Sequence, residues 1–397
     1  MSLWRYCILD NLFLQIGHSS VNKKNELLCG DFYTIVKDND TTTIVLSDGL
    51  GSGVKANILA TLTSKILSTL LSKNLPMEES IYTMARTLPV CKERKLAYST
   101  FSIIQIKGNQ AYLVQYDNPE IIILRNGKNL SYRSTRTFIE EKEIYESRVQ
   151  IQENDMIILF SDGVTHAGLG KTTNDGWDRE DIIKRLELWY SENMSAQRMA
   201  ANLINGCMAL NMDSADDDTT VLVFKVKERQ AVNLLIGPPE NKEEDNKILR
   251  LFFSKEGKSV VCGGTTATAV SKYLNKPIKI IDNPDTDEEI PSIASIEGVD
   301  LVTEGVITLS KVVKLSSEYV DDSATSLKVK DKKDGASLLA EMLFEEATDI
   351  NIFFGQAINA GHEDIGLDID FKTKCELIKI LESNLIKMGK QVKISKC

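Results

Sequence analysis

Hydrophobic residues in the first 228 positions follow two patterns. A run of β-branched and aliphatic residues at 42–46 and a continuous apolar run at 156–160 are typical of buried β-strands. Beyond Gly53, apolar residues recur with helical spacing, at positions 54, 58, 59, 62, 66, 67, 70 and 71. Further predicted strands are 32–36, 100–106, 111–116, 120–124 and 220–226, and further predicted helices are 76–87, 178–190 and 196–208. Strands clustered in this way, with helices in pairs between them, predict an α+β domain built on an antiparallel sheet.

The pattern changes after residue 228. The charged stretch KERQ at 227–230 ends the first unit, and strands then alternate with helices. The predicted strands are 231–236, 258–262, 278–282 and 350–354, and the predicted helices are 242–255, 265–274 and 372–389. This alternation is typical of a smaller α/β unit with some parallel pairing. We therefore expect two domains, 1–228 and 229–397.

Composition and charge narrow the classes of function. The chain has 397 residues, of which 42% are hydrophobic and 26% charged, ordinary values for a globular protein. Its 57 acidic and 47 basic residues give a formal net charge of -10, which disfavours nucleic acids and anionic membranes as partners. Arg5 and Asp10 interrupt the apolar start, so we expect no signal peptide, and no run approaches the roughly 18 apolar residues of a membrane span. Seven cysteines without metal-ligand spacing indicate a cytoplasmic protein with reduced thiols.

Acidic residues stand at the ends of the predicted strands. The tripeptide Ser-Asp-Gly follows both continuous apolar strands, with Asp48 in the first copy and Asp162 in the second. Asp31 directly precedes a strand, and Asp217 and Asp218 directly precede the closing strand of the first domain. If these strands are neighbours, their carboxylates meet at one site, and their repulsion raises pKa values there. Mg²⁺ or Mn²⁺ would remove that repulsion, because both ions prefer oxygen ligands.

Two other interpretations of these motifs are weaker. A single Ser-Asp-Gly after a strand is most often a turn or a cap, but here it occurs twice, in order with two further acidic motifs. The glycine-rich loop at 49–53 could instead hold a nucleotide phosphate. A Walker-type loop needs Gly-Lys-Ser/Thr, whereas Gly53 is followed by Val54, and the spacing G-x-G-x-x-G is absent from the loop. A divalent metal site is the better hypothesis.

In this order the motifs resemble the type 2C metal-dependent protein serine/threonine phosphatases, specifically the bacterial branch typified by stage II sporulation protein E. The resemblance covers residues 1 to about 228 and does not extend to the second domain. The matching segments are Gly-Asp-Phe at 30–32, Ser-Asp-Gly-Leu-Gly-Ser-Gly at 47–53, Ser-Asp-Gly-Val at 161–164 with Ala167, and Asp-Asp-Thr-Thr-Val at 217–221. Asp-Asn-Pro at 117–119 is similar to a proline-containing strand pair that lies under the site in the family.

The resemblance implies a β-sandwich of two antiparallel sheets flanked by helices, with two Mn²⁺ or Mg²⁺ ions at one end. By this resemblance Asp48 would bridge the two ions, and the carbonyl of Gly49 would bind one of them. Asp162 and Asp217 would complete the other. Two ions about 4 Å apart can share a water, lower its pKa and aim it in line at phosphorus, so no covalent enzyme intermediate is expected.

Further positions follow from the same resemblance. Asp31 would bind metal directly or through water, and Asp218 would lie beside the ligands. Larger type 2C enzymes carry a histidine after the first Asp-Gly, where this chain has Leu50, so the acid that protonates the leaving group is unassigned. His166 is a candidate for that proton transfer, and Lys55 is a candidate for attracting phosphate or substrate. The alternative is a surface or structural histidine for His166 and a solvated helix residue for Lys55.

The second domain offers one candidate site. The turn Gly263-Gly264-Thr265 stands between a strand and a helix, where free backbone N–H groups can bind an anion or a small-molecule ligand. Alternatively, it is a tight turn in which Thr265 caps the helix. The turn Gly237-Pro238-Pro239 also follows a strand and is expected to face the same crevice. We expect a regulatory or substrate-docking module.

The sequence thus predicts a cytoplasmic, metal-dependent phosphatase that hydrolyses phosphoserine or phosphothreonine in a phosphorylated protein substrate. One alternative is a catalytically silent relative that binds partners through the same fold. The acidic motifs argue against it, because a binding module has no need for all four. A second alternative is a metal-dependent hydrolase of small phosphorylated molecules, with the second domain binding the metabolite. Assays on phosphoprotein and metabolite substrates separate it from the first prediction.

Overall fold

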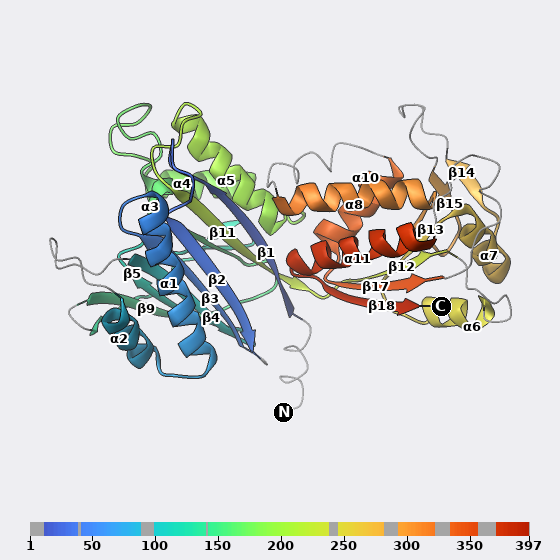
Figure 1. Ribbon diagram of the computed structural model, residues 1–397, viewed down its shortest axis with the longest axis horizontal. Helices are drawn as coiled ribbons and strands as arrows, with labels where there is room; N and C mark the ends of the chain where they lie inside the picture. Colours follow the sequence, from blue (N-terminus) through green and yellow to red (C-terminus); the bar gives the residue numbers. More distant parts are fainter. Residues whose placement is uncertain are drawn as a thin grey trace. The chain divides into compact units, whose positions relative to one another are not determined.

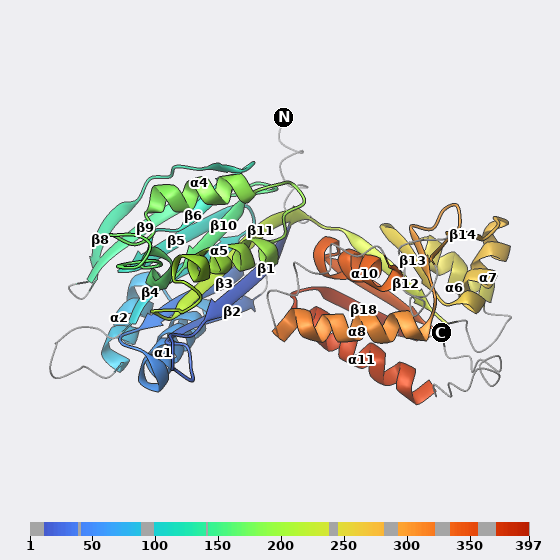
Figure 2. The same cartoon turned by 90° about the horizontal axis from the view of Figure 1, so that it is seen from above.

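The chain forms two compact units, Met1–Glu228 and Arg229–Cys397, each with hydrophobic cores of its own. Figures 1 and 2 show the elements of both units from two directions. The computed structural model describes residues 12–38, 41–88, 99–139, 142–237, 245–281, 293–321, 334–355 and 371–396.

The first unit contains two antiparallel sheets. The larger has six strands in the order β2-β3-β4-β5-β9-β8. Its strands are β2 (Asp31–Asp38), β3 (Thr41–Gly49), β4 (Ser99–Lys107), β5 (Gln110–Tyr116), β8 (Thr135–Ile139) and β9 (Lys142–Gln150). The other has five strands in the order β1-β11-β10-β6-β7. Its strands are β1 (Leu12–Val21), β6 (Ile122–Arg125), β7 (Lys128–Asn129), β10 (Met156–Phe160) and β11 (Thr219–Glu228).

The two sheets pack face to face around a shared core. Ile44 and Ile104 of the larger sheet belong to one cluster with Ile157, Leu222 and Phe224 of the smaller sheet. The outer face of the larger sheet is covered by α1 (Gly53–Ser72) and α2 (Met77–Thr87), and that of the smaller sheet by α4 (Arg179–Trp189) and α5 (Ala196–Leu210). β3 and β10 are continuously apolar because both of their faces are buried. The predicted α+β sandwich with flanking helices is confirmed.

Four strands of the first unit, namely β1, β7, β8 and β9, have no counterpart among the predicted ones. β1 pairs with β11 along its whole length, and its residues alternate between buried and partly exposed. β8 and β9 are largely polar, because much of each strand faces solvent. Arg5 and Asp10, which bear on the question of a leader segment, lie outside the described residues. Within the described ranges, no helix is both long and apolar enough to cross a membrane.

The second unit is a seven-stranded sheet with helices on both faces. Its order is β14-β15-β16-β13-β12-β17-β18, in which the strands from β16 to β18 run parallel and β14 and β15 are antiparallel additions. The strands are β12 (Ala231–Ile236), β13 (Lys258–Cys262), β14 (Lys279–Ile281), β15 (Ile293–Ser295), β16 (Leu301–Thr303), β17 (Asp349–Phe354) and β18 (Gln391–Lys396). The α/β class with parallel pairing is confirmed.

Helices cover the two faces of this sheet in sequence order. The earlier pair, α6 (Asp245–Phe253) and α7 (Gly264–Leu274), packs on one face. The later helices, α8 (Val306–Asp321), α10 (Gly335–Ala340) and α11 (Phe371–Lys387), pack on the other. A π-helical segment, Glu341–Glu346, follows α10. The helix at α8 was not among the predicted elements.

Candidate metal centre

The predicted carboxylates come from two strand pairs, one in each sheet of the first unit. Asp31 begins β2 and Asp48 stands near the end of β3, and the antiparallel register places the two residues opposite each other. In the other sheet, Asp162 follows β10 and Asp217 precedes β11, and these two strands are also antiparallel neighbours. The charges of the two pairs act on each other, so the pairs meet at one end of the sandwich. The site is therefore built between two sheets and not along four adjacent strands.

The glycines of the two Ser-Asp-Gly motifs are required by close backbone contacts. A Cβ atom on Gly49 would lie 2.0 Å from the carbonyl oxygen of Ala56 in α1. A Cβ atom on Gly163 would lie 2.2 Å from the carbonyl oxygen of Asp218. Glycine thus allows α1 to pack directly on the end of β3, and allows the short helix α3 (Asp162–Thr165) to lie against the acidic segment before β11.

Asp31 lies deep in the site. It is 4% exposed, and its Oδ2 accepts a hydrogen bond of 2.7 Å from the hydroxyl of Ser161. Burial is the main cause that raises its pKa, and the charges of Asp218 and Asp162 act in the same direction. Hydrogen bonds from Ser161 and Thr220 oppose this, and the resulting pKa is about 7. Its Oδ1 is buried and has no hydrogen-bond partner in the described structure.

Asp48 and Asp162 share a hydrogen bond that joins the two strand pairs. Burial raises the pKa of Asp48, and the charges of Asp31, Asp162 and Asp217 raise it further. Burial also raises the pKa of Asp162; His166 lowers it and Asp217 raises it. Two carboxyls that share a hydrogen bond keep one proton between them unless a cation takes the place of that proton.

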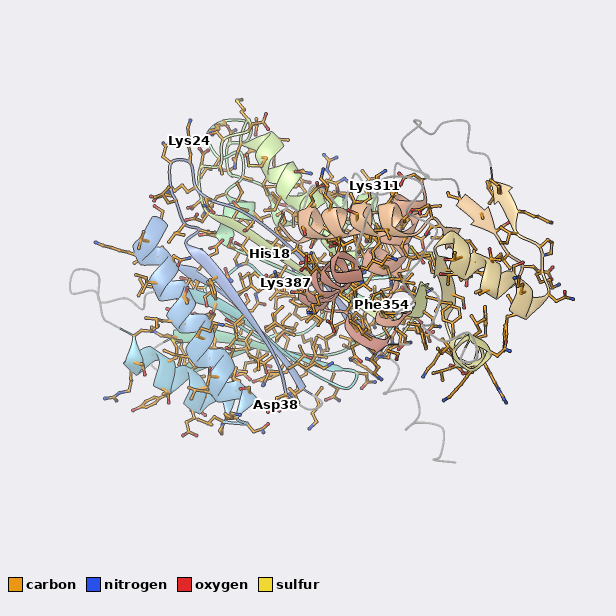
Figure 3. The ribbon with its side chains drawn as sticks, turned by 45° about the vertical axis from the view of Figure 1, so that its right-hand side comes forward. His18, Lys24, Asp38, Lys311, Phe354 and Lys387 are labelled. Atoms are coloured by element: carbon orange, nitrogen blue, oxygen red, sulfur yellow. The ribbon has the colours of Figure 1, made fainter. Side chains whose placement is uncertain are left out.

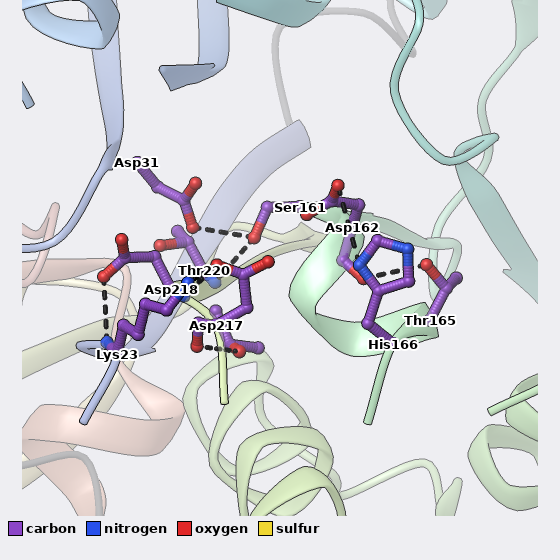
Figure 4. Close-up of polar contacts among 10 residues, drawn as sticks. Lys23, Asp31, Ser161, Asp162, Thr165, His166, Asp217, Asp218 and Thr220 are labelled. Carbon is purple, nitrogen blue, oxygen red and sulfur yellow. Dashed lines mark hydrogen bonds and ion pairs between the residues drawn. The ribbon is translucent and has the colours of Figure 1, made fainter. Parts of the chain in front are cut away.

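His166 stands at the exposed rim of the site, beside two of the carboxylates (Figure 4). Its Nδ1 is 3.7 Å from Oδ2 of Asp162, and its side chain is 51% exposed. One ligand atom from each of Asp162, His166 and Asp217 lies within 4.8 Å of the others. The structure therefore places His166 beside the predicted carboxylates, and its role as a proton donor stays a prediction.

Asp218 occupies the inner side of the site and is 4% exposed. Its Oδ1 accepts a hydrogen bond of 2.9 Å from the backbone N–H of Lys23, whose ammonium group lies 3.7 Å from Oδ1 of Asp217. The Oδ2 of Asp218 is buried without a hydrogen-bond partner among the residues described, and a Cβ atom on Gly30 would lie 2.8 Å from this oxygen. The glycine of the Gly-Asp-Phe motif thus leaves room for this carboxylate.

The residues present fit a divalent cation centre. Carboxylates converge from both sheets, and burial and mutual repulsion raise the pKa of three of them, Asp31, Asp48 and Asp162. Buried oxygens of Asp31 and Asp218 lack hydrogen-bond donors within the described ranges. Divalent cations prefer such oxygen ligands and would remove the repulsion.

The other predicted positions are less directly involved. Gly49 is buried at the end of β3, and its N–H donates to the carbonyl of Gly30 at 3.1 Å. The proposed role of its own carbonyl as a metal ligand stays a prediction. Lys55 is exposed in the first turn of α1. Leu50, which stands where larger enzymes have a histidine, is 46% exposed.

Several residues that act on the carboxylates were missing from the predicted set. Ser161 and Thr220 donate hydrogen bonds to Asp31, and both stand next to predicted acids in the same motifs. Their adjacency was the available signal. Lys23 carries no such signal, because it lies in a loop, whereas Asp117 belongs to the Asp-Asn-Pro segment that the resemblance placed under the site. Asp117 has a positive φ of 48° and adds to the charges that raise the pKa of Asp162.

An acidic site at one end of an antiparallel β-sandwich, with helices on both outer faces, defines the first unit as a domain of the type 2C phosphatase class. Residues 38–227 match the family model of stage II sporulation protein E (SpoIIE). The first domain is therefore a SpoIIE-type domain, as the sequence motifs predicted.

Two curated relatives agree with this assignment. The chain is similar to phosphoserine phosphatase RsbU of Bacillus subtilis (strain 168), with 25% identity over 228 residues that cover 54% of this chain and 64% of RsbU. It is also similar to stage II sporulation protein E of the same organism, with 22% identity over 216 residues that cover 53% of this chain and 25% of that protein. The chain thus spans less than two thirds of either relative.

Solved structures with a similar domain include the PP2C phosphatase domain of SpoIIE from Bacillus subtilis with a fragment of its regulatory domain. That structure has 19% identity and a TM-score of 0.48, and the match covers 55% of this chain and 65% of that one. The catalytic domain of the serine/threonine phosphatase PstP, in complex with two manganese ions, has 18% identity and a TM-score of 0.40. That match covers 55% of this chain and 100% of that one.

Proposed function

We propose that the first domain is a metal-dependent phosphatase that hydrolyses phosphoserine or phosphothreonine in a protein substrate. The observation that carries this proposal is the convergence of carboxylates from two sheets, with raised pKa values and with buried oxygens that lack donors. The match to the SpoIIE family and the similarity to a phosphoserine phosphatase support the same activity.

The proposed ligands are Asp31, Asp48, Asp162 and Asp217, with the Gly49 carbonyl. Two bound Mn²⁺ or Mg²⁺ ions would supply an activated water and neutralise the phosphoryl oxygens. The chain itself fixes the ligands. The hydroxyl of Ser161 orients Asp31, and the pairing of β2 with β3 sets the separation of Asp31 and Asp48.

His166 is the proposed donor of the proton that the leaving oxygen requires. A serine or threonine alkoxide is a poor leaving group, so general acid catalysis assists its departure. The ring lies at the exposed rim, where a substrate side chain can reach it, and Asp162 lies within 3.7 Å to orient it. Lys55 is exposed in the first turn of α1, and its role in attracting phosphate or substrate stays a prediction.

The substrate class is tested by comparing a phosphoserine peptide and a phosphothreonine peptide with a panel of sugar phosphates and nucleotides, all with Mn²⁺. We expect higher kcat/KM on the peptides. Turnover of metabolites alone would replace the protein substrate with a small molecule. Turnover of neither class, for the full chain across several metals, would favour a silent binding protein.

The second domain is proposed to regulate the first or to select its substrate. It has its own cores and its own cavity, which makes a separate ligand plausible on physical grounds. If such a ligand changes the affinity of the first domain for its substrate, the two sites are allosterically coupled in the thermodynamic sense.

A further inference from the structure

The second unit has a cavity at the topological switch point of its sheet. β12, the first of the parallel strands, lies between β13 and β17, and later strands are added outward on either side. Helices that follow β12 and β13 cover one face, and those that follow β16 and β17 cover the other. In doubly wound sheets of this kind, ligands bind outside the carboxyl ends of the strands where the winding reverses. A cavity of about 330 Å³ lies at that position.

A glycine follows each of the four central parallel strands. Gly237 follows β12, Gly263 follows β13, Gly305 comes two residues after β16 and Gly355 follows β17, and all four line the cavity. The φ angles of Gly237 and Gly263 are +76° and +119°, a region that favours glycine. Because these positions carry no side chains, a ligand can approach the backbone closely.

Further residues stand at the carboxyl ends of β12 and β17. Phe354, the last residue of β17, lines the cavity and is labelled in Figure 3. Pro238 and Pro239 of the predicted turn after β12 lie outside the described residues. The N–H of Gly355 donates to the carbonyl of Ile236 at 2.8 Å, which joins the two strands on either side of the switch point.

The cavity is positive at the start of α7. The N-cap of this helix is Gly263, whose carbonyl accepts a hydrogen bond from Ala267, and no side chain caps it. The alternative in which Thr265 caps the helix is therefore wrong. Lys374 of α11 also lines the cavity. Helix N-terminal N–H groups and an ammonium group together attract an anion.

Two buried polar atoms at the cavity have no partner among the described residues. Thr266 is 2% exposed, and its Oγ1 lacks a hydrogen bond. This oxygen lies 3.3 Å from the place of a Cβ atom on Gly263. Oε2 of Glu304, another lining residue, is buried and also lacks a hydrogen bond. A buried polar atom of this kind costs stability until a partner arrives, so both atoms indicate a ligand with an acceptor and a donor.

The one thiol at the cavity is not a reactive group. Cys262 is buried, and its Sγ donates to the carbonyl oxygen of Glu304 at 3.0 Å. Burial raises the pKa of this thiol to about 12. A protonated thiol is a poor nucleophile, so the cavity is suited to binding and not to covalent chemistry.

We propose that this cavity binds a small organic phosphate that carries hydroxyl groups, such as a sugar phosphate or a mononucleotide. The phosphate accepts hydrogen bonds from the start of α7 and from the hydroxyl of Thr266, close to the ammonium of Lys374. A hydroxyl of the ligand donates to Glu304. The volume is at the low end of small-molecule sites and fits one small molecule better than a dinucleotide. The proposal does not depend on the activity of the first domain.

The test is isothermal titration calorimetry of the full chain with ribose 5-phosphate, adenosine monophosphate, inorganic phosphate, ribose and citrate. EDTA is present throughout, so that no cation in the first domain can hold phosphate. We expect one site per chain for at least one of the two organic phosphates, and at least tenfold weaker binding of inorganic phosphate and ribose. Equal affinity for the two organic phosphates indicates a sugar phosphate, and tighter binding of the nucleotide indicates a base contact.

Variants place the ligand in the cavity. In Gly264→Asp the new side chain meets no atom within 4 Å at Cβ, and its carboxylate stands at the start of α7, where it would repel phosphate. We expect at least tenfold weaker binding in this variant and in Lys374→Gln. Lys379→Gln, an exposed position on the same helix that does not line the cavity, is the matched control and should bind normally.

Three outcomes overturn the proposal. If neither organic phosphate binds the wild type, the cavity is not a site for this class. If citrate alone binds, the anion is a carboxylate and not a phosphate. If binding is unchanged in both Gly264→Asp and Lys374→Gln, the ligand lies elsewhere on the chain.

Discussion

Without a bound cation, the carboxylates of the acidic site in the first domain repel each other. This repulsion makes the stability of the domain depend on pH. The folded state raises the pKa of Asp31, Asp48 and Asp162, so it binds more protons than the unfolded chain does above the ordinary carboxyl pKa of about 4. The free energy of unfolding therefore falls as pH rises from about 4 through the raised pKa values, the one of Asp31 being about 7. The carboxylates that are proposed to bind metal therefore lower the stability of the metal-free fold.

We predict that Asp48→Asn stabilises the metal-free protein at pH 8, on the order of 1 kcal/mol, because it removes a buried carboxyl whose ionisation the folded state opposes. The gain should shrink at pH 5, where the wild-type carboxyls hold their protons. Urea denaturation in EDTA measures it. Asp216→Asn is the matched control, since Asp216 is half exposed and pairs with Lys171 outside the cluster. Equal stability of Asp48→Asn and wild type at both pH values would contradict the repulsion.

A second prediction concerns the side chain of His166. If it protonates the leaving oxygen, His166→Gln should reduce kcat on a phosphoserine peptide about 100-fold or more. Its effect on p-nitrophenyl phosphate should be much smaller, because nitrophenolate departs without a proton. Side-by-side kinetics with Mn²⁺ show the difference. A similar loss on both substrates would assign the histidine to metal binding or to structure.

The acids could be found from the sequence because each stands beside a strongly apolar strand in a short motif. Asp48 and Asp162 share the same tripeptide, and its glycine is explained by a backbone contact that only the fold reveals. Lys23 could not be found in this way, and Asp117 was indicated only through the resemblance of its Asp-Asn-Pro segment to the family. Their places at the site depend on loops whose paths are set by tertiary pairing.

At the scale of elements, hydrophobic pattern predicted the buried strands and failed for the exposed ones. β3 and β10 are buried on both faces, so their apolar runs are unambiguous. β8 and β9 carry polar residues on exposed positions and were missed. The hydrophobic pattern of the sequence also gave no information on which strands share a sheet. The division of the carboxylates between two sheets is therefore seen only in the structure.

A buried ion pair fixes the start of β10 against β6. Both Nε and Nη2 of Arg125 donate to Asp155, at 3.0 and 2.8 Å, and Asp155 is fully buried. Arg125→Ala leaves that carboxylate without its cation, and we predict a loss of about 3 kcal/mol in the free energy of unfolding. All three tryptophans, Trp4, Trp177 and Trp189, lie in the first domain, so tryptophan fluorescence in urea reports its unfolding.

The control for this prediction is Arg136→Ala. Arg136 pairs with Glu143 at an exposed position, where an ion pair contributes little to stability because water screens the charges. If the two variants lose the same stability, the buried pair is not the element that holds β6 and β10 together.

At the scale of the whole molecule, two units of different class share one chain. The first is an antiparallel sandwich with an acidic site, and the second is a doubly wound, largely parallel sheet with a cavity at the carboxyl ends of its central strands. The change of pattern near residue 228 predicted that difference in class. The strand order of the second unit could not be predicted, because parallel strands find their neighbours through tertiary packing and not through local turns.

The measurement that tests the central claim most directly is the release of phosphate from p-nitrophenyl phosphate and from a phosphoserine peptide, with and without Mn²⁺. It compares the full-length wild type with Asp48→Asn and Asp162→Asn. The account predicts that wild-type activity requires the metal and falls at least 100-fold in both variants, because each removes a proposed ligand. Metal-independent activity, or full activity in either variant, would contradict it.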